Sequence, residues 1–219
     1  MSLIVFIAVI FAAIIHSVWN GMVKKHDDKY IALVSLVLGH IPLSIIVLFF
    51  TPMISLESIP YILISGIFLA GYEWCLLSAY RLEDYTKIYP IARGSAPIFI
   101  VIFSLLFFSI NISTFELIGI FVISLGIIIL SFQNFKIINN YSAIFYAIAT
   151  GFFISCYSIT DGFGGRVSFS PLNYTAWLMI FNAAVAFPIL LLIMKKSYGY
   201  KKVFTKGKNF FFVGGALSY

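Results

Sequence analysis

Four polar side chains that could do chemistry lie inside long apolar stretches of this sequence. His16 and Asn20 are four residues apart in the first stretch, Glu73 lies in the third and Arg93 in the fourth. A charge at the centre of a bilayer costs on the order of 2.5–3.5 kcal/mol on insertion scales, so each such group needs a partner or a function. Imidazole and carboxyl groups exchange protons, and a guanidinium binds anions. Such a set is typical of a solute or ion pathway.

The first stretch predicts a polar edge on a helix. Ala8, Ala12, His16 and Asn20 recur every four residues, so they form one stripe, and the small residues favour close approach of a neighbouring helix. We interpret His16 and Asn20, with Trp19 beside them, as an edge that faces a substrate. Hydrogen bonding between helices is the alternative for the same two side chains.

Glu73 shares a helical face with Gly66 and Ala70, so it is predicted to face the interior of a helix bundle. A carboxyl group at this depth is protonated or paired, and Arg93 is its natural partner. The functional hypothesis is that Glu73 carries a coupling proton or holds a cationic part of a substrate. The alternatives are a structural Glu73–Arg93 pair, an Arg93 that holds an anionic substrate, and an Arg93 that reaches the interface.

The fourth stretch contains Pro90, Gly94 and Pro97. This spacing predicts a break that leaves backbone groups facing a cavity, as in transporter helices that bind ligands. An ordinary proline kink is the alternative.

The sequence predicts no enzyme, cofactor or metal site. Its three histidines and eight acidic residues give no nucleophile–base pair, carboxylate dyad or zinc-type spacing. The glycine-rich segment Asp161–Arg166 lacks the ending of a phosphate loop, and we expect a flexible external loop with an Asp161–Arg166 pair. Cys75 and Cys156 are expected to pack as small hydrophobic residues.

Composition predicts an all-α integral membrane protein. Of 219 residues, 62% are hydrophobic and 10% are charged, against about 45–50% and about 25% in soluble domains. The net charge of +6 resides mainly in loops between apolar spans, which argues against nucleic acid as a partner. Spans of about 20 residues are predicted at Leu3–Val23, Tyr30–Phe50, Ile59–Tyr80, Ile88–Ser109, Phe115–Phe132, Tyr141–Thr160 and Leu172–Met194, with the start of an eighth at Asn209–Tyr219.

The pattern of spans occurs nearly twice. A shift of 138 positions places Ala13 on Gly151, Ser17 on Ser155, Trp19 on Tyr157 and Asn20 on Ser158. We therefore predict two five-helix repeats, at residues 1–135 and 136–219, the second one incomplete. A further expectation is that the natural protein continues beyond Tyr219 to ten helices.

The loop charges indicate that the two repeats are inverted. The loop Thr51–Ser58 has no Lys or Arg, whereas its counterpart Lys195–Lys208 has six. Of the 14 basic residues, all but Arg93 and Arg166 fall after odd-numbered spans. Because Lys and Arg mark the cytoplasmic side, we predict an external N-terminus. Inverted repeats are the architecture of many secondary transporters.

Three segments resemble the EamA-type branch of the drug/metabolite transporter superfamily: His16–Asn20, Tyr80–Pro97 and Asp161–Trp177. The most specific part is Tyr-Pro-Ile-Ala-Arg-Gly-Ser-Ala-Pro at residues 89–97. The resemblance implies a ten-helix secondary transporter of two inverted repeats, with both termini in the cytoplasm. That placement of the N-terminus differs from the one the charges predict.

Together these patterns predict one site near the membrane centre, shared by the two repeats. Its predicted substrate-binding residues are His16, Trp19, Asn20, Glu73, Tyr89, Arg93, Tyr157 and Ser158. The predicted function is secondary transport of a small metabolite or drug-like solute across a bacterial cytoplasmic membrane, with protons as the candidate coupling ion. The alternatives are a flippase for a lipid-linked carrier, which a lateral opening to lipid would favour, and a membrane scaffold or sensor. The sequence does not predict an oligomeric state.

Overall fold

The computed structural model describes residues 3–26, 28–108, 112–132, 140–193, 205, 207–208 and 210–218, and none of these residues forms a β-strand. The long helices are α1 (Leu3–Lys25), α2 (Lys29–Phe49), α3 (Ile59–Leu82), α4 (Tyr85–Phe107), α5 (Thr114–Ile129), α6 (Tyr141–Val167) and α7 (Pro171–Ile193). Short 3₁₀ turns at Leu56–Ser58 and Leu130–Phe132 adjoin α3 and α5, and a π-helical turn (Phe210–Gly214) leads into α9 (Gly215–Ser218). Within these residues, six helices are long and apolar enough to cross a membrane, and α5 is a shorter apolar helix. The predicted all-α membrane fold is confirmed.

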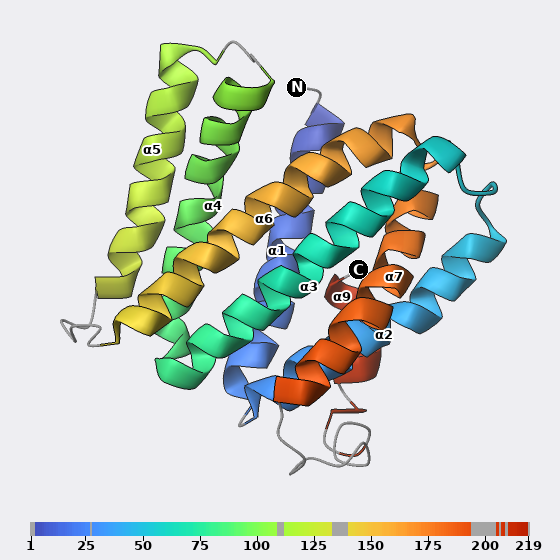
Figure 1. Cartoon of the computed structure of the whole chain (residues 1–219), viewed down its shortest axis with the longest axis horizontal. Helices are drawn as coiled ribbons and strands as arrows, with labels where there is room; N and C mark the ends of the chain where they lie inside the picture. Colours follow the sequence, from blue (N-terminus) through green and yellow to red (C-terminus); the bar gives the residue numbers. More distant parts are fainter. Residues whose placement is uncertain are drawn as a thin grey trace.

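Local capping explains where several helices begin. Asp28 Oδ1 accepts hydrogen bonds from the backbone of Tyr30 and Ile31 at the start of α2, and Asn140 does the same for α6. Ser113 and Glu116 form a capping box on α5. Successive helices run in alternating directions, so the connections lie at two opposite ends of the bundle (Figure 1).

The predicted flexible loop at Asp161–Arg166 is wrong, because these residues form the last turns of α6. A side chain at Gly164 would collide with the ring of Tyr174 in α7, so this glycine permits close helix packing. Asp161 accepts a hydrogen bond from the Tyr174 hydroxyl at 2.8 Å, in place of the predicted pair with Arg166.

The predicted break in the fourth helix is also absent from the described structure. Helix α4 runs continuously through Pro90 and Pro97. A Cβ atom at Gly94 would lie 2.6 Å from the side chain of Ile128 and 2.9 Å from the carbonyl oxygen of Ser124, both in α5. Gly94 therefore serves the α4–α5 contact and does not open the backbone to a cavity.

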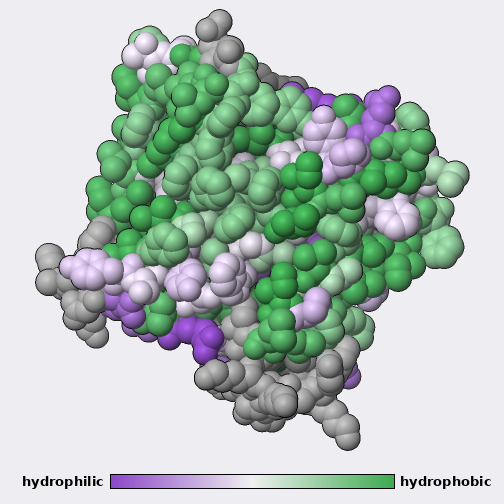
Figure 2. Space-filling model, viewed as in Figure 1, coloured by the Kyte–Doolittle hydropathy of each residue, from purple (hydrophilic) through white to green (hydrophobic). Residues whose placement is uncertain are grey.

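The buried core has two main parts. One lies between α2, α3 and α7 and includes Val34, Leu77 and Ala186. The other lies between α3, α4 and α6. A stripe of small residues on α6 is buried there, and it comprises Ala143, Ala147, Gly151 and Ser155. The face of the molecule seen in Figure 2 is mainly apolar, as a lipid-facing surface requires.

Helix α1 differs from the other spans because almost all of its apolar residues are exposed. Ala8 and Ala12 are exposed, so the predicted close packing of these small residues is wrong. Near its C-terminal end α1 contacts α2 and the short helix α9. There Val23 packs with Leu36 and Phe210.

Candidate functional site

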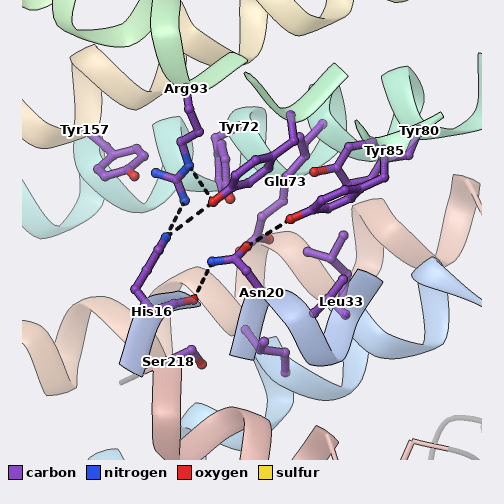
Figure 3. Close-up of a pocket in the computed structure, with 14 residues that line it drawn as sticks. His16, Asn20, Leu33, Tyr72, Glu73, Tyr80, Tyr85, Arg93, Tyr157 and Ser218 are labelled. Carbon is purple, nitrogen blue, oxygen red and sulfur yellow. Dashed lines mark hydrogen bonds between the residues drawn. The ribbon is translucent and has the colours of Figure 1, made fainter. Parts of the chain in front are cut away.

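A pocket of about 180 Å³ lies between the C-terminal half of α1 and the helices α2, α3, α4, α6 and α9. Figure 3 shows its side chains converging from these elements. The lining residues are His16, Asn20, Val23, Leu33, Leu36, Tyr72, Glu73, Leu76, Tyr80, Tyr85, Tyr89, Arg93, Tyr157 and Ser218.

Among the described residues that line this pocket, Arg93 is the one with a cationic side chain. Its Nε donates to the Tyr89 hydroxyl at 3.2 Å, and its Nη2 lies 3.2 Å from His16 Nε2. The guanidinium carbon also lies 5.4 Å from the centroid of the Tyr89 ring, within the range of a cation–π contact. Tyr157 and Tyr72 flank the guanidinium in Figure 3. The Arg93 guanidinium, which stays charged, thus lies in the wall of a small polar pocket.

Asn20 makes the second polar link between α1 and α4. Its Nδ2 donates to the His16 carbonyl at 2.7 Å, one turn earlier in its own helix. Its Oδ1 accepts a hydrogen bond from the Tyr85 hydroxyl at 3.3 Å. The backbone bond orients the amide so that its oxygen faces α4.

Glu73 faces the bundle interior as predicted and is 5% exposed. The predicted pair with Arg93 is wrong: Glu73 Oε1 accepts from Asn182 Nδ2 in α7 at 2.9 Å. The second carboxyl oxygen has no hydrogen-bond partner among the described residues. The physical reason is geometric, since the guanidinium is engaged by Tyr89 and His16 on the α1 side of the pocket. Asn182, itself buried, is therefore the polar partner of Glu73.

Tyrosines form most of the pocket's aromatic wall. Tyr85 stacks on Tyr89 with centroids 5.0 Å apart, and Tyr80 lies 5.0 Å from Tyr85. Tyr72 meets Tyr157 edge to face at 5.9 Å. The sequence analysis missed Tyr80 and Tyr85 as site residues. A signal for Tyr85 exists in the spacing of Tyr85, Tyr89 and Arg93, which recur every four residues and share one face of α4.

Six of the eight predicted site residues line this one pocket: His16, Asn20, Glu73, Tyr89, Arg93 and Tyr157. Ser158 is not part of the lining, because adjacent residues on a helix point in different directions. The side chain of Trp19 lies outside the described structure. The aromatic residues Trp74 and Trp177 are 43% and 38% exposed and lie outside the pocket lining. A role of the lining residues in substrate binding stays a prediction.

Apolar spans around a buried polar pocket define the general class of polytopic membrane proteins. The sequence model of the EamA-like transporter family matches residues 1–132, which is more than half of the chain. The protein belongs to this family of membrane transporters, which is not a family of enzymes. No curated protein and no solved structure matches the chain. The match covers the first predicted repeat.

Proposed function

We propose that this protein is a secondary transporter that moves a small metabolite or drug-like solute across the cytoplasmic membrane by alternating access. The observation that carries the proposal is the pocket that six predicted residues share. It places a guanidinium, an imidazole, an amide and several tyrosine hydroxyls beside a carboxyl group inside a bundle of apolar helices. Polar groups at membrane depth that face a cavity mark solute and ion pathways.

The packing of the helices supports two inverted repeats at residues 1–135 and 136–219. Exchanging the repeats relates α1 to α6, α2 to α7, and α3 to the segment containing Phe210–Gly214 and α9. Helix α3 packs on α6 and on α7, and the segment related to α3 contacts α1 and α2, as this exchange requires. The exchange leaves the contact between α2 and α7 unchanged, because it only swaps these two helices. The pocket then lies where the two repeats meet, which suits rocking about a central site.

The lining favours a small polar solute over a lipid-linked carrier. The charged and hydroxylic groups of Arg93, Tyr89 and Tyr85 face the space that a solute would occupy. The proposed partners are therefore a small solute, the surrounding bilayer and a coupling proton.

Substitutions in the pocket test this proposal. In proteoliposomes, uptake of a panel of radiolabelled carboxylates, amines and neutral solutes identifies the transported probe. Asn20→Ala and Tyr157→Ala are each expected to raise the KM for that probe about tenfold, equivalent to about 1.4 kcal/mol, with unchanged protein abundance. Phe145→Ala is the matched control, because Phe145 is an exposed residue of α6. An unchanged KM in both pocket variants, or equal effects in the control, would contradict the proposal.

A further inference from the structure

The pocket holds a partly buried cation, Arg93, for which the described residues provide no anionic partner. Among the described residues, the ion pair found is Lys87–Glu83, and Arg93 takes part in none. A guanidinium carries five N–H donors and cannot be deprotonated in a protein. Its Nε and Nη2 contacts to Tyr89 and His16 use neutral acceptors, so neither contact supplies a negative charge. Withdrawing a charge from water without an opposite charge nearby is costly, which makes Arg93 a site for a negatively charged group.

The Arg93–His16 contact also fixes the protonation state of His16 in the empty pocket. Arginine has only donors, so His16 Nε2 must act as the acceptor in the 3.2 Å contact. An imidazole that accepts at Nε2 carries its hydrogen on Nδ1 and is neutral. Protonation at Nε2 would place two cations at hydrogen-bond distance and abolish the acceptor.

Few charged groups face His16 from the elements around it. The titratable lining side chains are Arg93, Tyr85 and Tyr89 from α4, Tyr72, Glu73 and Tyr80 from α3, and Tyr157 from α6. The residues that α2 and α9 contribute to the lining carry no titratable group: they are Leu33, Leu36 and Ser218. The one carboxyl group among them, Glu73, is bonded to Asn182. Among the described residues that line the pocket, Arg93 is thus the charged group nearest to a proton on His16.

We propose that the pocket binds a small organic anion at Arg93 together with one proton at His16. The anion accepts from the guanidinium, and Nε2 of His16, no longer needed as an acceptor for Arg93, takes a proton from solvent and donates its new N–H to the anion. No bond other than this N–H forms, and the pocket takes up one anion and one proton with no net change of charge. The inference rests on the proposed substrate pocket and names its substrate class and its proton carrier.

The two ligands are then coupled reciprocally. Because the anion removes the repulsion between Arg93 and a protonated His16, binding of either ligand favours the other. For uptake of one proton, anion affinity increases by at most about tenfold for each unit by which the pH falls. This behaviour distinguishes a proton at His16 from a simple anion site, whose affinity would not depend on pH.

Benzoate is the probe for this test, because it combines a carboxylate with a ring that suits tyrosine walls and stays ionised from about pH 6 to about pH 8. Calorimetric titration of the purified protein in two buffers of different ionisation enthalpy gives the number of protons taken up per benzoate. We expect uptake approaching one proton at about pH 8 and tighter binding at about pH 6. Neutral benzamide is expected to bind at least tenfold more weakly than benzoate. Proton-free benzoate binding by the unmodified protein overturns the inference.

Variants assign the proton to its residue. His16→Gln should bind benzoate without proton uptake, whereas Glu73→Gln should retain it, and Arg93→Gln should lose benzoate binding. His26→Gln is the matched control, because His26 lies outside the pocket lining. Loss of proton uptake in Glu73→Gln with retention in His16→Gln would make Glu73 the carrier and overturn the assignment. Absence of benzoate binding would reject the anion class, while the flux measurements on Asn20 and Tyr157 decide separately whether the pocket serves transport.

Discussion

At the residue scale, the bond between Glu73 and Asn182 satisfies one oxygen of a carboxyl group that is buried between α3 and α7. Replacing Asn182 by Leu removes the donor and leaves that oxygen without a partner. An unsatisfied buried polar group costs about 1–3 kcal/mol, so we expect Asn182→Leu to lower the thermal midpoint of the purified protein. Glu73→Gln is expected to have little effect on stability, because its amide oxygen still accepts from Asn182 Nδ2.

The double variant with Leu at both positions is the control for this bond. It removes donor and acceptor together, so it should be more stable than Asn182→Leu alone. Adding Arg93→Gln to either single variant should restore nothing, since Arg93 is bonded to Tyr89 and His16. Restoration by Arg93→Gln would reinstate an ion pair between Glu73 and Arg93.

Residue types predicted which side chains line the pocket better than they predicted the hydrogen-bond partners of those side chains. His16, Glu73 and Arg93 could be placed in the interior because polar groups avoid hydrocarbon. The partner of Glu73 depends on how α3 crosses α7, and a sequence pattern does not contain a crossing position. Charge indicated Arg93 as that partner, whereas the structure places Asn182 there.

At the element scale, glycines in α6 have opposite structural roles. A Cβ atom at Gly151 would collide with the Ser95 hydroxyl and lie 2.9 Å from the Ala92 carbonyl oxygen, whereas one at Gly162 meets nothing within 4 Å. Gly151→Ala is expected to destabilise the protein by about 1–3 kcal/mol through overpacking. Gly162→Ala should instead stabilise it by about 0.5–1 kcal/mol, because alanine loses less backbone conformational entropy than glycine when it becomes helical. Thermal unfolding in detergent compares the two, and a change of equal sign would contradict the packing of α6 on α4.

Hydrophobicity predicted the existence of each long helix, and capping residues such as Asp28 and Asn140 fixed several starts. Glycine and proline were less informative. The glycines near Gly164 were interpreted as a loop, and Pro90 as a break, because both residue types disfavour helices in isolation. In the bundle, Tyr174 packs on Gly164 and α4 continues past Pro90, so tertiary packing decided both cases.

At the scale of the whole molecule, the distribution of Lys and Arg predicts which end of the bundle lies in the cytoplasm. Single cysteines at the exposed residues Thr114 and Phe169 should react with an impermeant thiol reagent that is added outside intact cells. Cysteines at the exposed residues Thr86 and Ser142, at the opposite end, should react after permeabilisation. The native Cys75 and Cys156 are first replaced by Ala. The reverse pattern would place the N-terminus in the cytoplasm, as the family resemblance implies.

The exposed flank of α1 makes the lipid bilayer part of the pocket's surroundings. The N-terminal half of this helix packs on little protein, so its tilt responds to the thickness of the hydrocarbon layer. His16 and Asn20 are carried by the same helix and contact α4 through side-chain hydrogen bonds. We therefore expect a change in acyl-chain length to alter the distance between α1 and Arg93, and with it the width of the pocket.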